Sequence, residues 1–254
     1  MINLKNTLLT LLLTGTLLLG GCTDAAPAPS TPQEAVECTM NSIKALDMAT
    51  LNEYTDNYVQ TIHHWSGVPI ENEYRTFNEL LQPQSKNSRR YQTALELNQK
   101  MVEQLTWEIT AVREDGDTAE IDMVVTNIDM QKVMEQLTAQ ILGDILKTPY
   151  SGVPQIITKT VTSSVQANEA MISLIDALDD NDICTNTVTA LAYREQGQWK
   201  VHLTHDFINA FSGNVYADID SEAIAELEEQ VDRMAEEWAD SIEERMNSWM
   251  EQFE

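Results

Sequence analysis

The sequence predicts an α+β fold, in which helices pack against antiparallel β-hairpins and a long acidic helix follows them. Two pairs of segments alternate apolar with polar residues, and each pair flanks a short turn that contains glycine, which is typical of a hairpin. Before, between and after these pairs, apolar residues recur every three or four positions, as they do in amphipathic helices. The order of the segments therefore favours a mixed fold with antiparallel strands.

Residues 1–22 have the order of a signal peptide. Lys5 and the amino terminus supply positive charge, Thr7 to Leu19 form an apolar run, and small residues lead to Cys22. The run is short for a membrane span, which takes about 20 apolar residues. A cysteine directly after Leu-Gly-Gly resembles the lipobox of bacterial lipoproteins. The resemblance implies cleavage after residues 1–21 and acyl chains on the Cys22 sulfur. The alternatives are an ordinary signal peptide, or an anchor helix with a chance cysteine.

The segment after the cysteine predicts a tether. From Thr23 to Pro32 the residues are small, polar and rich in proline, and they cannot bury enough apolar surface to fold. We therefore expect residues 22–31 to be a lipidated cysteine followed by an extended linker. Such a linker lets a folded domain stand away from the membrane surface.

Helical periodicity dominates the next part of the chain. Thr31 suits a helix cap, and the apolar residues that follow Pro32 recur at helical spacing. Asp47 begins a second helix. A loop around Gly67 leads to a third helical segment over 71–81, and a fourth helix spans 88–104.

The two hairpins are predicted by alternation on both sides of a turn. Residues 105–125 alternate apolar and polar side chains around Asp115-Gly116. The second hairpin begins with Cys184 to Arg194, which are rich in β-branched residues, and turns at Gln196-Gly197. Its second strand is predicted from Trp199 to His205, where apolar residues again alternate with polar ones.

Helices are predicted between and after the hairpins. Asp129 caps a helix with one apolar stripe, and the prolines at 149 and 154 end it. Another helical pattern runs from there to about Asp179. After the second hairpin, Asp206 is expected to cap a short helix over 207–211, which ends at Gly213.

The segment 218–254 has the pattern of one amphipathic helix. It contains 14 acidic residues and two arginines, a charge of −12. Its apolar residues are spaced by threes and fours, which places them on one stripe. The residues of the predicted interaction face are Leu227, Val231, Met234, Trp238, Ile242, Trp249 and Phe253.

Composition narrows the classes of function. The chain has 15 basic and 41 acidic residues, a net charge of −26, and this charge repels nucleic acid and anionic lipid head groups. We expect no nucleic-acid partner, whereas a basic protein surface is compatible with the charge. Besides Cys22, the chain has Cys38 and Cys184. They are either a disulfide, which an oxidising compartment permits, or two buried thiols.

The order of elements resembles the cystatin-like or nuclear-transport-factor-2-like domains of bacterial lipoproteins whose function is uncharacterised. The motifs that carry the resemblance are Pro32-Gln33-Glu34-Ala35-Val36 with Leu46-Asp47, and Gly197-Gln198-Trp199-Lys200-Val201. It covers residues 32–213 and implies a curved antiparallel sheet of two hairpins wrapped on helices, a cone that can hold a pocket. The long helical stretch between the hairpins and the acidic helix over 218–254 depart from that pattern. The fold alone gives no function.

Candidate sites for chemistry are few. His205 beside Asp206, at the end of a strand, would place an imidazole and a carboxylate at a pocket mouth for acid–base catalysis. The alternative is that Asp206 caps the next helix and His205 is an ordinary strand-end residue. His63-His64 is a poor chelate, and the acidic turn 179–182 lacks the pattern of a calcium loop. We expect no metal and no cofactor.

The resulting hypothesis is a lipoprotein outside the cytoplasm, on the cell membrane or the outer membrane. It binds a protein partner or small ligand without catalysis. Membrane attachment is through the lipid on Cys22. The helix over 218–254 docks a partner, associates with itself, or packs back on its own domain, since a stripe of this width needs a cover. The alternative is a pocket enzyme, a hydrolase or isomerase that uses His205 and Asp206.

Overall fold

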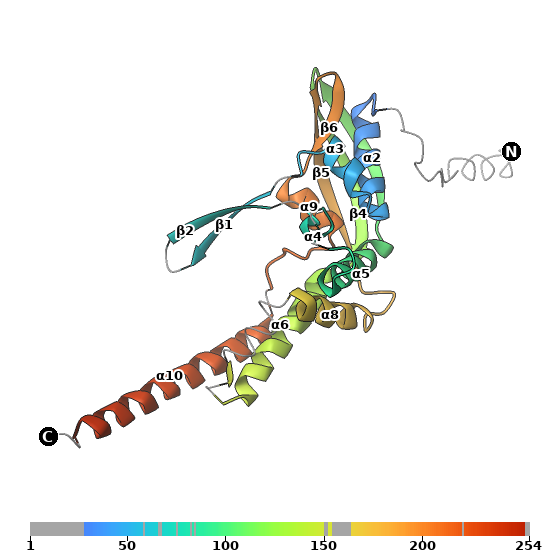
Figure 1. Cartoon of the computed structure of the whole chain (residues 1–254). Helices are drawn as coiled ribbons and strands as arrows, with labels where there is room; N and C mark the ends of the chain where they lie inside the picture. Colours follow the sequence, from blue (N-terminus) through green and yellow to red (C-terminus); the bar gives the residue numbers. More distant parts are fainter. Residues whose placement is uncertain are drawn as a thin grey trace.

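A computed structural model describes residues 28–57, 59–65, 68–74, 76–81, 83, 85–149, 152–153, 164–219 and 221–251. Its body is a four-stranded sheet with helices packed on it, and a long helix projects from that body (Figure 1). The fold is therefore α+β, as the sequence predicts. The signal-peptide and lipobox predictions, Cys22 included, lie outside the described residues.

The first two helices form where the sequence predicts them. Helix α2 spans Pro32–Ala45, and the Thr31 hydroxyl caps it by accepting a hydrogen bond from the Glu34 N–H. Helix α3 spans Met48–Tyr54 and is capped in the same way by Asp47. Each helix buries one apolar side, because its apolar residues recur at helical spacing.

The structure differs from the prediction between α3 and α5. Strands β1 (Val59–Trp65) and β2 (Val68–Tyr74) form a separate antiparallel hairpin, with His63 opposite Ile70. The predicted helix over 71–81 is wrong, since only α4 (Asn78–Leu81) is helical there. Alternation is weak in this segment, so periodicity alone does not distinguish the hairpin from a helix.

The main sheet has the order β3-β4-β5-β6 and is antiparallel throughout. Its four strands are β3 (Thr106–Asp115), β4 (Thr118–Ile128), β5 (Ile183–Glu195) and β6 (Gln198–His202). Both predicted hairpins are present, and β4 pairs with β5 along its whole length. A β-bulge interrupts β3 between Ile109 and Ala111.

The second predicted hairpin is shorter than expected. Strand β6 ends at His202, and His205 is the first residue of α9 (His205–Phe211) rather than a strand residue. The Thr204 hydroxyl accepts a hydrogen bond from the Phe207 N–H at 3.2 Å, so Thr204 is the cap, where we predicted Asp206. The alternation continues past His202 in the sequence, but the cap ends the strand.

Three further helices lie between the N-terminal hairpin and β5. Helix α5 spans Arg89–Glu103, and α6, capped by Asp129, spans Met130–Lys147. Helix α8 spans Ser164–Ile175, so the helix predicted to reach about Asp179 ends four residues earlier, in a turn, and the first part of that prediction, 154–163, lies outside the described residues. Among the described helices, none combines the length and the apolar character needed to cross a membrane.

The main hydrophobic core lies on the face of the sheet that α2 and α9 cover. Its largest fully buried side chains include Trp199, Phe207, Phe211, Met40 and Ile121. The Lys44 ammonium, at the end of α2, donates to the Leu105 carbonyl at 2.7 Å and fixes that helix to the start of the sheet. A second, smaller cluster joins α6 to α8. Helix α6 also contacts the last helix of the chain.

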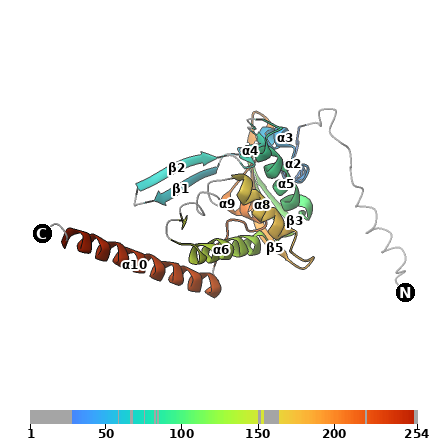
Figure 2. The ribbon, with the colours of Figure 1, turned by 60° about the horizontal axis from the view of Figure 1, so that its bottom comes forward.

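Helix α10 spans Glu222–Glu251 and is about 45 Å long at 1.5 Å per residue. Its first half lies beside α6, and its second half extends away from the body in both views of the ribbon (Figures 1 and 2). The predicted long C-terminal helix is therefore confirmed.

Candidate functional site

The apolar stripe of α10 is covered along only part of its length. Ile224 is buried, and a half-buried set follows it. That set comprises Leu227, Val231, Met234 and Trp238. Farther along the same stripe, Ile242 is 38% exposed and Met246 is 58% exposed. The other two residues of the predicted face, Trp249 and Phe253, lie where side chains are not described.

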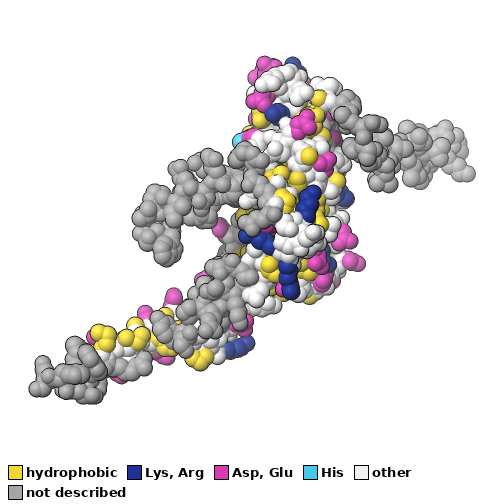
Figure 3. All heavy atoms as spheres, viewed as in Figure 1, with side chains coloured by type: hydrophobic (Ala, Val, Ile, Leu, Met, Phe, Trp, Pro, Cys, Tyr) yellow, Lys and Arg dark blue, Asp and Glu magenta, His cyan; other side chains and the backbone are white. Residues whose placement is uncertain are grey.

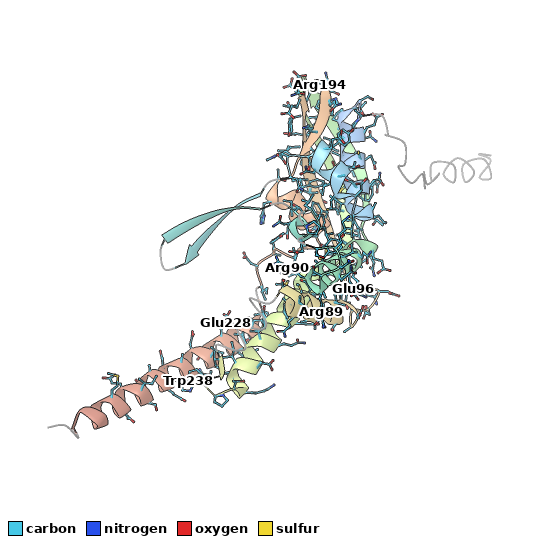
Figure 4. All side chains as sticks on the ribbon, in the orientation of Figure 1. Arg89, Arg90, Glu96, Arg194, Glu228 and Trp238 are labelled. Atoms are coloured by element: carbon cyan, nitrogen blue, oxygen red, sulfur yellow. The ribbon has the colours of Figure 1, made fainter. Side chains whose placement is uncertain are left out.

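Acidic side chains surround this stripe. Glu228 and Glu244 are exposed on α10, and Arg233 pairs with Glu229 one turn earlier in the helix. Apolar and acidic side chains alternate along the visible side of the projecting helix (Figure 3), and Figure 4 labels Glu228 and Trp238 upon it. The surface is thus apolar along its centre and strongly negative at its edges.

The predicted catalytic pair is exposed to solvent. His205 and Asp206 have side chains 63% and 93% exposed, and 3.8 Å separates His205 Nδ1 from Asp206 Oδ1. The His205 ring lies 5.8 Å from the ring of Tyr216. Neither side chain is held in a closed site, so the pair lacks the water exclusion that strengthens acid–base catalysis.

A different histidine contacts a carboxylate, and this pair was not predicted from the sequence. His202 Nδ1 contacts Asp56 Oδ2, and Asp56 Oδ1 accepts a hydrogen bond from the Leu203 N–H at 2.9 Å. The Asp56 N–H donates to the Val201 carbonyl at 3.3 Å, which brings the segment after α3 alongside β6. Spacing gives no signal for this pair, because 146 residues separate its members.

The surroundings of His202 are partly polar and open. Burial raises the pKa of Tyr193, and the negative charges of Asp56 and Glu195 raise it further. Lys200 Nζ lies 2.7 Å from Glu195, and this hydrogen bond raises the pKa of the lysine. The His202 side chain is 49% exposed. The His202 imidazole therefore lies at an open surface, without the water exclusion that strengthens acid–base catalysis.

Two grooves lie elsewhere on the molecule. One, of about 640 Å³, lies between the end of α2 and α5 and is bordered by Lys44, Leu95 and Lys100. The other, of about 480 Å³, lies between β5 and α9 and is bordered by Thr187 and Asp206. Neither lining includes His205 or His202.

The other candidate sites from the sequence are the acidic turn 179–182 and the pair His63-His64. In the acidic turn, Asp179 Oδ1 accepts from the Asn181 N–H at 2.7 Å, while Asp182 pairs with Lys132, which lowers the pKa of Asp182. Among the described residues, no three histidine, cysteine or acidic side chains lie close enough to hold a metal ion. His63 and His64 lie in β1, in a segment whose side chains are not described.

The two cysteines of the folded part are thiols in this structure. Cys184 Sγ lies 3.6 Å from the Ile128 carbonyl, and burial raises the pKa of this thiol. Cys38 lies on α2, near Tyr54. Both cysteines are half-buried here, and no bond joins them.

Comparison of the chain with protein-family models, curated proteins and solved structures finds no match.

Proposed function

We propose that this chain is a lipoprotein outside the cytoplasm, anchored through Cys22, that binds a basic partner protein along α10 without catalysing a reaction. Residues 1–21 are the signal peptide in this proposal, 22–31 the tether, 32–213 the folded domain and 218–254 the docking helix. The binding role is supported by one observation: the apolar stripe of α10 is buried at its start and exposed farther along. Ile224 is buried, but Met246 is 58% exposed.

The chemistry of the partner follows from the charge on the helix. The segment 218–254 carries −12, so a partner with basic residues around an apolar groove gains both contact and charge attraction. A second copy of the chain would bring 14 further acidic residues to the same place, and like charges disfavour that arrangement. An anionic membrane is disfavoured for the same reason, since interfacial helices carry basic polar faces.

We also propose that the main sheet curves around α2 as in the cystatin-like or nuclear-transport-factor-2-like domains that the sequence resembles. Two features support this proposal. The helices of the main core pack on one face of the sheet, and β3 contains a bulge at Ile109, which increases local twist and bending. The His205–Asp206 pair supports no second function, because both side chains are exposed.

Site-specific photo-crosslinking in cells tests the docking role. A photoreactive residue replaces Met246, on the exposed stripe, or Glu244, which lies nearly opposite on the helix. The Met246 position is expected to give a discrete adduct with a basic protein, and the adduct should weaken as salt rises. The Glu244 position should give little of it. Adducts only between two copies, or equal adducts from both positions, would overturn the proposal.

A further inference from the structure

More than half of strand β5 has a neighbouring strand on one side only. Strand β6 pairs with Leu191–Glu195, whereas β4 pairs with β5 from Ile183 to Tyr193. The stretch 183–190 therefore has an open edge, and within the described parts of the chain no strand lies along it. At about 3.4 Å per residue, this edge is roughly 27 Å long.

The alternation of an antiparallel ladder identifies the backbone groups at this edge. The Arg194 N–H donates to the Asp117 carbonyl at 2.8 Å, on the β4 side. Even-numbered residues of β5 therefore direct their backbone groups to β4, and odd-numbered residues direct theirs to the opposite side. The N–H and C=O groups of Thr185, Thr187 and Thr189 consequently point to the open edge.

Two of these three threonines direct their hydroxyl groups away from the open edge. Thr185 Oγ1 lies 3.0 Å from Thr126 Oγ1, and Thr189 Oγ1 donates to Asp122 Oδ1 at 2.8 Å. Both hydroxyl groups thus reach across to β4 on the face of the sheet.

The edge lacks the features by which proteins usually prevent strand addition. The sequence 183–190 contains no charged residue, proline or glycine. The opposite edge of the sheet is different, since β3 carries a bulge after Ile109 and the charged residues Glu108, Arg113 and Glu114. An unprotected edge promotes aggregation unless a binding partner covers it, because it pairs readily with extended chains.

A groove runs beside this unprotected edge. It has a volume of about 480 Å³, and α9 with the turn after it forms its other wall. Thr187 and Thr189 border it on the strand, and Asp206 and Asn209 border it on the helix. Of the residues that line this groove, Asp206 is the one with a charged side chain. A groove between an edge strand and a helix fits an extended peptide.

We propose that this groove binds an extended basic peptide segment of a protein, which adds to the sheet beside β5. The backbone groups of Thr185, Thr187 and Thr189 pair with the peptide backbone, and Asp206 selects a cationic side chain. The net charge of −26 favours the same peptides. The site is separate from the stripe on α10, so each proposal can fail without the other.

A matched pair of variants separates backbone pairing from side-chain effects. Thr187→Pro removes the N–H that points to the edge and no bond to β4, while Thr187→Val keeps that N–H. The probe is an acetylated, amidated heptapeptide of alternating lysine and valine, added to the intact chain. We expect saturable binding that Thr187→Pro weakens about tenfold or more and Thr187→Val changes less than about twofold. Equal binding by both variants would overturn the proposal.

Two further measurements do not depend on how well the proline variant folds. Binding of the probe should slow hydrogen exchange at the amides of Thr185, Thr187 and Thr189, and a probe with N-methylated amides should not bind. Asp206→Asn should weaken binding of the lysine-containing peptide and leave binding of an uncharged alternating peptide unchanged. Amides already protected in the free chain, or equal binding of the N-methylated probe, would contradict strand addition.

Discussion

The side chain of Asn127 joins two distant carbonyl groups inside the protein. Its Nδ2 donates to the Phe211 carbonyl at 2.7 Å and to the Met101 carbonyl at 2.8 Å, while Oδ1 accepts from the Ile128 N–H at 2.9 Å. Asn127 is fully buried. One amide therefore connects the ends of α5, β4 and α9, which surround the junction of the two hydrophobic clusters.

Replacing Asn127 by leucine should destabilise the fold. The change leaves buried carbonyl groups without a donor, and it is expected to lower the free energy of unfolding by roughly 2–4 kcal/mol. Urea denaturation measures this difference. Asn41→Leu is the control, because the Asn41 amide donates to the Glu37 carbonyl at an exposed position. Equal effects of the two substitutions would show that the buried network is unimportant.

Gly213 is a position where only glycine fits. It has a φ of +69°, and a Cβ added there would lie 2.1 Å from the Ile128 carbonyl oxygen. Gly213→Ala should therefore destabilise the protein more than Gly116→Ala, where φ is +62° but no atom lies within 4 Å. We expect about 1 kcal/mol at Gly116 and a clearly larger loss at Gly213. Thermal unfolding of the two variants compares them, and similar midpoints would contradict this contact.

The acid stability of the protein should depend on Asp122. Hydrogen bonds from Arg113, and then from Thr189, lower the pKa of Asp122 to about 2, below its ordinary value of 3.8. Because the pKa is lowered in the folded state, the carboxylate stabilises the fold at pH values above 3.8. The contribution is lost as the pH falls toward 2. Asp122→Asn should flatten the stability curve in this window, and an unchanged curve would reject the prediction.

The two ends of the α10 stripe should differ in their effect on stability. Ile224 is buried, so Ile224→Ala is expected to lower the free energy of unfolding by roughly 2–4 kcal/mol. Met246 is largely exposed, so Met246→Ala should change stability by less than about 0.5 kcal/mol. Denaturant unfolding of the isolated chain measures both. A large cost at Met246 would mean that the chain itself covers this part of the stripe.

Local signals in the sequence predicted most of the fold. Asp115-Gly116 and Gln196-Gly197 each lie between alternating segments, and both hairpins form there. Thr31, Asp47 and Asp129 cap helices as expected, since capping depends on residues three positions away. These features are determined by short-range contacts, so a single sequence is enough to find them.

The errors arise where long-range contacts decide the structure. Alternation suggested that β6 reaches His205, but the hydroxyl of Thr204 starts a helix instead. The His202–Asp56 contact depends on how the segment after α3 lies along β6, and no local pattern encodes that arrangement. The open edge of β5 likewise results from the short length of β6. Site geometry was therefore less predictable than the elements that build it.

The mass of the protein purified from cell membranes tests the central claim, that lipid on Cys22 holds this binding domain at a membrane. We expect a chain that lacks residues 1–21 and carries acyl chains on Cys22. A Cys22→Ser variant should carry no lipid and should be released from the membrane fraction. A chain that retains Met1, with an unmodified Cys22, would show that no lipid anchors this protein.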